Sequence, residues 1–166
     1  MIILVSGLPG SGKSYFAEKL AARLGAAYLN SDQVRIAMQA SGKYTLEDKL
    51  WVYRQMALET EKLINEKKKV VVDATFYRQD IRDLFFKLTK NKSIPIRIIN
   101  VTANEALIRE RLKKPRKYSE ADFAVYEKIR DEFEAITAPH LALQSTDSNI
   151  TSLLNKAIQY IGDGRK

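Results

Sequence analysis

Hydrophobic positions along the chain follow two alternating patterns. Short, continuous apolar runs are separated by stretches in which apolar residues recur every three or four positions. Continuous runs are typical of buried strands, and the recurring pattern is typical of amphipathic helices. The predicted strands are residues 2–6, 26–30, 69–75, 94–101 and 141–145. The predicted helices are residues 12–24, 32–40, 46–66, 81–88 and 150–161. A further helix is predicted from a capping box at Thr102 and Glu105 to about residue 113. Another is predicted at residues 120–137, with a capping box at Ser119 and Asp122 and a stop at Pro139.

The order of these elements predicts the fold class. The strands lack polar alternation and each is followed by a helix, which favours an α/β fold with a five-stranded parallel sheet flanked by helices on both faces. In such sheets, ligands bind beyond the carboxyl ends of the strands. We therefore expect the segments after the first, second, third and fifth strands to share one rim.

The segment after the first predicted strand carries the most specific motif. Residues 7–14 read GLPGSGKS and match the P-loop pattern G-x-x-x-x-G-K-[ST]. Glycines let the backbone aim N–H groups at phosphate oxygens, Lys13 reaches the β- and γ-phosphates, and the Ser14 hydroxyl is a ligand for Mg²⁺. A glycine-rich turn without a ligand is the alternative, which the strand–turn–helix context disfavours. The predicted nucleotide-binding residues are Gly7, Pro9, Gly10, Ser11, Gly12, Lys13, Ser14 and Tyr15.

Composition and charge narrow the possible partners. The chain has 166 residues, which predicts a single domain over residues 1–166. Cysteine is absent, so disulfides are excluded and a reducing cytoplasm is expected. No apolar run is long enough for a membrane span, and no obligate protein partner is evident. The net charge of +8 indicates an anionic partner, such as a nucleoside triphosphate or a nucleic acid.

Two acidic residues follow predicted strands on the same rim. Asp32 and Arg35 lie in NSDQVR after the second strand, and Asp73 and Thr75 lie in VVVDATF at the end of the third. A carboxylate at Asp32 could accept the proton of a hydroxyl that attacks the γ-phosphate, and Asp73 could position Mg²⁺. We expect Arg35, Asp73 and Thr75 to bind substrate, with Asp73 and Ser14 at the metal. The alternatives are a helix cap at Asp32, a surface ion pair at Arg35 and a structural role for Asp73.

Together these motifs carry a resemblance. GLPGSGKS, NSDQVR, VVVDATF followed by Arg82, and a basic ERL segment resemble the P-loop kinases of the polynucleotide 5′-kinase and zeta-toxin-like group. The resemblance implies a P-loop NTPase kinase fold in which Asp32 is the general base and Arg35 contacts a phosphate beside the acceptor hydroxyl. Adenylylsulfate kinases are also similar, with an acid and an arginine in the same region.

A basic segment, RERLKKPRK at residues 109–117, occupies the place of a kinase lid. Kinase lids exclude water and bring cations to the transferring phosphoryl group. We predict a lid at about residues 113–119 and assign Arg111 and Arg116 to catalysis with Lys13 and Asp32, in preference to Arg109. A solvated helix face is the alternative for some of these charges.

Other residues are weaker candidates. Phe76 and Tyr77 could stack on bases at the rim, and Ser145, Thr146 and Asp147 could contact the adenine base. The sequence thus predicts a kinase that uses ATP or GTP with Mg²⁺ and phosphorylates a hydroxyl, for which we expect the 5′-OH of a polynucleotide. A small-molecule kinase and a non-catalytic, nucleotide-binding regulatory module are the alternatives.

Overall fold

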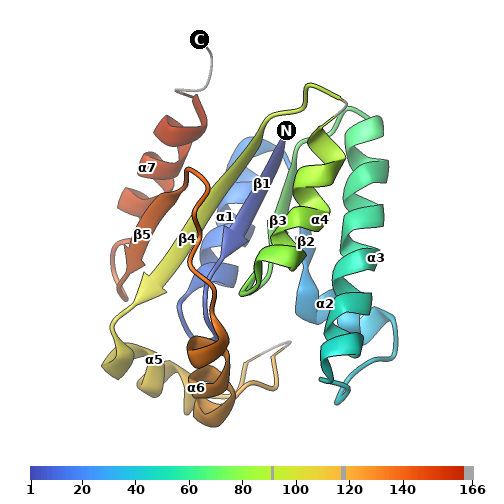
Figure 1. The fold of residues 1–166 in the computed structure, drawn as a ribbon. Helices are drawn as coiled ribbons and strands as arrows, with labels where there is room; N and C mark the ends of the chain where they lie inside the picture. Colours follow the sequence, from blue (N-terminus) through green and yellow to red (C-terminus); the bar gives the residue numbers. More distant parts are fainter. Residues whose placement is uncertain (91, 117–118, 163–166) are drawn as a thin grey trace.

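The computed structural model describes residues 1–90, 92–116 and 119–162 (Figure 1). Its strands form one five-stranded parallel sheet in the order β2-β3-β1-β4-β5, which confirms the predicted sheet. The strands are β1 (Ile2–Ser6), β2 (Ala27–Asn30), β3 (Val70–Asp73), β4 (Ile96–Ala103) and β5 (Leu141–Ser145). The helices are α1 (Lys13–Leu24), α2 (Ser31–Ala37), α3 (Leu46–Asn65), α4 (Gln79–Thr89), α5 (Glu105–Leu112), α6 (Phe123–Glu132) and α7 (Ile150–Gly162).

Helices cover both faces of the sheet. Ile2 and Leu4 of β1 pack into the cluster formed with α3 and α4, and Ile3 and Val5 pack into the cluster formed with α1 and α7. Successive side chains of a strand point to opposite faces, so a strand that is covered twice needs an apolar residue at every position. This requirement explains the unbroken apolar run of β1.

Strand register brings two polar residues, Asn30 and Asp73, to one level of the sheet. Asn30 at the end of β2 lies opposite Asp73 at the end of β3, and Asp73 lies opposite Val5 of β1. The chain leaves the sheet after each of these strands, at the edge where the loop from β1 to α1 turns. The carboxyl-end rim expected from the sequence is therefore present.

Two helices near the predicted lid differ from the sequence-based prediction. The side chain of Asn104, not Thr102, accepts a hydrogen bond from the Ala106 N–H and caps α5. Helix α6 is capped by Asp122 and ends at Glu132, so the predicted end at 137 and the stop at Pro139 are wrong. The chain is already extended at Phe133, and the next N–H, at Glu134, donates to the Tyr77 carbonyl at 2.7 Å.

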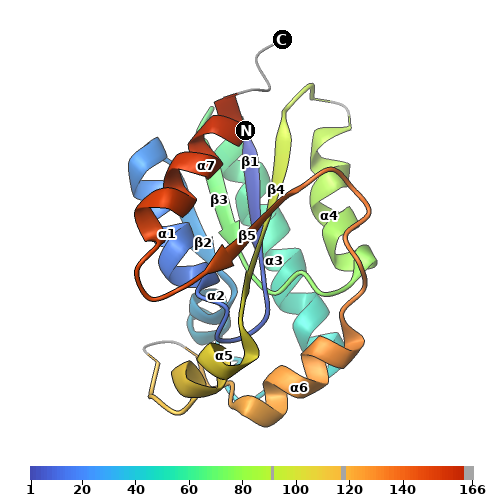
Figure 2. The same ribbon diagram turned by 90° about the vertical axis from the view of Figure 1, so that its left-hand side faces the viewer.

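Helices α5 and α6 lie beyond the carboxyl ends of the strands, where both views place them below the sheet (Figures 1 and 2). They therefore form a cover over the rim that carries the loop after β1. Among the residues that the structure describes, no helix combines the length and the apolar character needed to cross a membrane.

Candidate active site

The loop between β1 and α1 has a backbone that requires glycine. Gly10 and Gly12 have φ angles of 78° and 86°, in the left-handed region that other residues rarely adopt. A Cβ atom on Gly12 would lie 2.9 Å from the Ser145 Oγ and 3.1 Å from an Arg111 nitrogen, so a side chain there would also be crowded. Helix α1 starts directly at Lys13, which places the positive end of the helix at this loop.

Side chains from outside this loop hold its backbone by hydrogen bonds. The Ser145 hydroxyl, at the end of β5, donates to the Ser11 carbonyl at 2.6 Å. The Arg111 guanidinium donates to the Ser145 hydroxyl at 3.0 Å and to the Gly10 carbonyl at 3.2 Å, and it pairs with Asp147 at 3.4 Å. The structure thus brings Arg111 to the glycine-rich loop. Ser145 binds the loop itself, a role that the sequence analysis did not anticipate.

Asp73 is fully buried, and one of its two carboxylate oxygens accepts hydrogen bonds while the other has no partner among the described residues. Its Oδ2 accepts hydrogen bonds from the Tyr28 hydroxyl at 2.7 Å and from the Asn30 amide at 2.6 Å. Its Oδ1 has no hydrogen-bond partner among the described residues. Burial, then the neighbouring Asp73 charge, raises the pKa of the Tyr28 phenol, which therefore stays protonated as a donor.

A Mg²⁺ ion is compatible with these groups. The Asn30 amide that holds Asp73 also lies 3.5 Å from the Ser14 hydroxyl, which links the two predicted metal ligands. An unpartnered buried carboxylate oxygen and a nearby hydroxyl are the oxygen ligands that Mg²⁺ prefers, with phosphates and water completing the shell. Asp73 does not line the cavity described below, so the structure gives no support to its predicted contact with the acceptor.

Asp32 does not cap its helix. The Asn30 side chain accepts the Asp32 and Gln33 N–H groups at 3.0 and 3.1 Å and is the N-cap of α2, so the alternative of a helix cap at Asp32 is wrong. The Asp32 carboxylate instead lines a cavity beside Lys13. Burial raises the pKa of Asp32, and the charge of Lys13 is the largest effect that opposes this shift.

Arg35 is buried, which excludes a solvated surface ion pair. It donates to the Lys43 carbonyl at 2.8 Å and lies over the Tyr44 ring at 4.7 Å. Its Nε is buried and has no partner among the described residues, and no described carboxylate forms an ion pair with it. A buried guanidinium with an unused donor beside Asp32 is suited to bind an anionic ligand.

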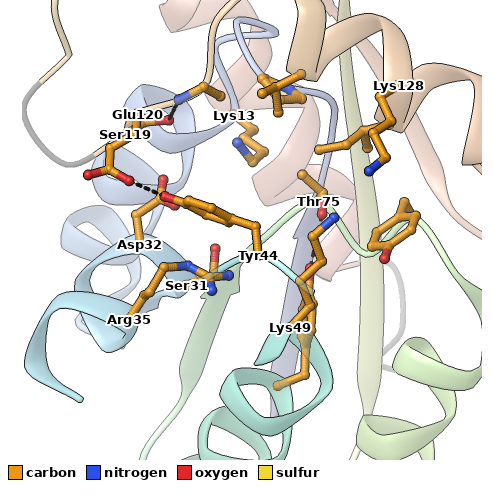
Figure 3. Close-up of a pocket in the computed structure, with 16 residues that line it drawn as sticks. Lys13, Ser31, Asp32, Arg35, Tyr44, Lys49, Thr75, Ser119, Glu120 and Lys128 are labelled. Carbon is orange, nitrogen blue, oxygen red and sulfur yellow. Dashed lines mark hydrogen bonds between the residues drawn. The ribbon is translucent and has the colours of Figure 1, made fainter. Parts of the chain in front are cut away.

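The cavity has a volume of about 200 Å³ and lies between the glycine-rich loop, α2, α3, the turn after β3, and α6 (Figure 3). Pro9, Lys13, Asp32, Arg35 and Thr75 of the predicted site line it. Ser119, at the end of the predicted lid, also lines it. The following residues of the wall were not predicted from the sequence: Ser31, Tyr44, Lys49, Tyr53, Glu120, Ala121, Val125, Lys128 and Ile129. Lys49 and Tyr53 lie four residues apart on one helix face, a spacing that could have indicated a shared wall.

The turn after β3 is fixed by Tyr53. The Tyr53 hydroxyl lies 3.0 Å from the Thr75 hydroxyl and accepts the Phe76 N–H at 3.2 Å. Phe76 has a φ of 49° and is fully buried, so it cannot stack on a base, and that expectation was wrong. Tyr77 lines the cavity, where its predicted stacking on a base stays a prediction. The same contacts orient Thr75 toward the cavity.

The arginines of the basic segment, residues 109–117, differ in the contacts that they make. Arg116 donates to the Ser119 hydroxyl and to the Ala121 carbonyl, each at 2.8 Å, and burial lowers its pKa while the Asp32 charge opposes this. Arg109 pairs with Glu105 at 3.3 Å and lies 3.7 Å from the centre of the Phe123 ring, which accounts for its charge locally. Residues 117–118 of the predicted lid lie outside the described residues.

A hydrogen bond spans the cavity mouth. The Tyr44 hydroxyl donates to the Glu120 carboxylate and joins the loop after α2 to the segment before α6. Burial, followed by the bond to Glu120, raises the Tyr44 pKa to about 12. This contact joins two segments of the cavity wall, and the cavity is partly enclosed.

Solved structures of low sequence identity share this fold. A sugar kinase from Janibacter sp. HTCC2649 is 17% identical, with 97% of this chain and 94% of that chain covered, at a TM-score of 0.76. The APS kinase CysC from Mycobacterium tuberculosis, in complex with AMPPNP and APS, is 20% identical at 97% and 96% coverage, with a TM-score of 0.73. The gluconokinase from Sinorhizobium meliloti 1021 is 17% identical at 97% and 91% coverage, with a TM-score of 0.71. No curated protein sequence matches the chain significantly.

These likenesses establish the P-loop NTPase kinase fold that the sequence predicts. The polynucleotide 5′-kinase group is not among the structures named above. A family model described as an AAA domain matches residues 2–136, which span the glycine-rich loop, the Asp32 segment, Asp73 and the basic segment. Because the match covers most of the chain, the chain belongs to this AAA domain family, AAA_33.

Proposed function

We propose that the protein is a kinase that transfers the γ-phosphate of ATP to a hydroxyl group of a small molecule. The observation that carries this proposal is the position of Asp32. Asn30 caps the helix, so the Asp32 carboxylate is left to face a partly enclosed cavity whose wall also includes Lys13 of the phosphate loop. A proton acceptor and a phosphate-binding cation on one cavity are the two requirements for phosphorylating an alcohol.

In this proposal the chain's residues divide into a donor side and an acceptor side. The N–H groups of residues 10–15 and Lys13 bind the phosphates of the donor, with Mg²⁺ held by Ser14 and Asp73 and supplying charge neutralisation. The acceptor oxygen bonds to the γ-phosphorus as the bond to the leaving ADP oxygen breaks, and its proton passes to Asp32. Arg111, at the loop, and Arg116, near Asp32, stabilise the charge on the transferring group.

The size of the cavity favours a small acceptor over a polynucleotide. A volume of about 200 Å³ accommodates a compact molecule, whereas a polynucleotide end needs a groove that continues past its first nucleotide. Arg109 and Lys113 of the basic segment pair with Glu105 and Glu110, so their charges are partly neutralised locally. A sugar kinase, a gluconokinase and an APS kinase among the structural neighbours support the same conclusion.

Transfer of labelled phosphate from ATP, with the substitution Asp32→Asn, tests the proposal. The wild-type protein is expected to label members of a panel of sugars, polyols, hydroxy acids and nucleosides more strongly than 5′-OH oligonucleotides. Asp32→Asn should lower kcat at least about a hundredfold, because proton acceptance is lost, while ATP affinity is retained. Asp131→Asn is the matched control, since that carboxylate is exposed and its ion pair among the described residues is with its neighbour Arg130.

Three results would contradict the proposal. Preferential labelling of oligonucleotides would assign a polynucleotide acceptor. Nucleotide binding with no transfer to any acceptor would favour a regulatory module. Full turnover of Asp32→Asn would remove Asp32 from the mechanism.

A further inference from the structure

Two lysines from different helices enter the cavity away from the phosphate loop. Lys49 lies in the first turns of α3 and Lys128 lies in α6, and both line the same cavity. In Figure 3 their side chains come from opposite walls, and the two ammonium groups point toward each other near Thr75. Among the described residues, neither ammonium group forms a hydrogen bond or an ion pair, although Lys49 lies 5.3 Å from the centre of the Tyr77 ring.

The two lysines differ in burial, since Lys49 is half-buried and Lys128 is exposed. Burial lowers the pKa of Lys49, the charge of Glu132 opposes the shift, and the charges of Lys128 and Arg35 lower it further. Glu132 thus offsets part of the positive charge at Lys49, and an anion bound between the two ammonium groups would be attracted by both of them. The arrangement therefore has the character of a binding site for an anion.

The other charged groups of the cavity do not compensate the two lysines. Asp32 lies by Lys13, and Glu120 accepts the hydrogen bond of Tyr44. Figure 3 shows both carboxylates on the far side of Tyr44 from the two lysines. Glu132 acts on Lys49 but does not line the cavity, so an anionic group of a ligand can pair with both ammonium groups there.

Apolar residues form part of the rest of the cavity wall. Tyr53, Val125 and Ile129 line the cavity, as does Thr75. The cavity thus presents a proton acceptor on one side of Tyr44 and two cations on the other, within a partly apolar wall. A ligand that fits all three has a hydroxyl at one end, a compact carbon body and an anionic group at the other end.

We propose that Lys49 and Lys128 form an anion subsite, and that the acceptor is a small hydroxylated anion bearing a carboxylate, sulfate or phosphate group. The identification of this ligand as the phosphate acceptor rests on the proposed kinase function. Anion binding by the two lysines does not depend on turnover. Lys49 and Lys128 are assigned to substrate binding and specificity and take no part in the chemical step.

Lysine footprinting tests the subsite without requiring catalysis. The protein is saturated with AMPPNP and Mg²⁺, so that the phosphate loop is occupied, and acetylation of each lysine is followed by mass spectrometry. Sodium sulfate should slow acetylation of Lys49 and Lys128 several-fold compared with sodium chloride at equal ionic strength. Lys156, exposed on α7, is the internal control and should not respond. Equal responses of all three lysines would overturn the subsite.

Acceptor pairs that differ by one anionic group test the specificity. Glycerol is compared with glycerate and glycerol 3-phosphate, and glucose with gluconate and glucose 6-phosphate, which also separates carboxylate from phosphate. The anionic member of a pair should be the better substrate. Lys49→Met and Lys128→Met should each raise the KM for the anionic acceptor about tenfold with kcat nearly unchanged, because each removes a charged hydrogen bond, whereas Lys156→Met should change neither.

The two proposals fail in different ways. If neutral acceptors are phosphorylated as well as anionic ones, and Lys49→Met leaves KM unchanged, the anion subsite is wrong and the kinase function stands. If sulfate protects Lys49 and Lys128 but no acceptor is phosphorylated, the subsite stands as an anion site and the kinase function is wrong.

Discussion

Arg82 offers a sharp test of how the acceptor side of the site is held together. This arginine is 1% exposed and donates to three backbone carbonyls, at 2.8 Å to Phe76, 3.0 Å to Glu134 and 3.0 Å to Ala135. It also donates to the Gln79 side chain. Arg82 thereby joins the turn after β3 to the segment after α6. We predict that its role is to position these two segments.

The substitution Arg82→Met keeps much of the buried volume and removes every one of these donors. A buried acceptor that loses its partner costs about 1–3 kcal/mol, and water entering the space relieves part of that cost. For three carbonyls we therefore expect a loss of about 3–5 kcal/mol in the free energy of unfolding. For a chain of this length, such a loss lowers Tm by about 10 °C.

Arg78→Met is the matched control at the start of the same helix. Arg78 forms a two-point contact with Asp80, at 3.0 and 2.7 Å, but that pair lies at the surface, where screening by water leaves little net stabilisation. Thermal unfolding followed by circular dichroism, and urea unfolding at 25 °C, measure both variants. A Tm loss for Arg82→Met no larger than that for Arg78→Met would refute the assignment of Arg82 as the tie between these segments.

Two further predictions concern the active site itself. Because burial raises the pKa of Asp32 above its value in the unfolded chain, the ionised carboxylate weakens the fold at neutral pH. Asp32→Asn should therefore raise Tm at pH 7.5, and thermal scans should show this difference shrinking as the pH falls through the raised pKa of the folded state and vanishing only well below the unfolded-state pKa of 3.8, where the carboxyl is protonated in both states. Arg111→Met should lower kcat about a hundredfold by removing a donor at the phosphate loop, with Arg109→Met as the control that keeps its turnover. Equal kcat values for these two variants would contradict the role of Arg111.

The sheet was predictable because its strands are continuous apolar runs. Strands β1 and β5 have the predicted limits, since burial on both faces leaves a simple pattern in the sequence. The third strand is shorter than the predicted 69–75, because Thr75 leaves the sheet to contact Tyr53. The limits of α6 were missed for a related reason, since apolar spacing does not reveal that Glu134 hydrogen-bonds to Tyr77.

The donor side of the site was predictable and the acceptor side was only partly so. The phosphate loop is a local motif, and its geometry follows from a few consecutive residues. The segment Asn30-Ser31-Asp32 offers three side chains that can cap a helix, and strand register decides among them by placing Asn30 opposite Asp73. Lys49 and Lys128 are far apart in the chain, and no local pattern connects them.

This asymmetry bears on how one fold accommodates different acceptors. The donor side is built from β1, α1 and a few residues at the strand ends, so its sequence is constrained by the backbone geometry that phosphates require. The acceptor cavity is assembled from α2, α3, the turn after β3 and α6, and each of these can change without disturbing the phosphate loop. Neighbours with 17–20% identity can therefore share the fold while their names specify different acceptors. For this chain, Arg35, Lys49 and Lys128 are the basic side chains that α2, α3 and α6 contribute to that cavity, and the chemistry of the proposed acceptor is therefore inferred from them.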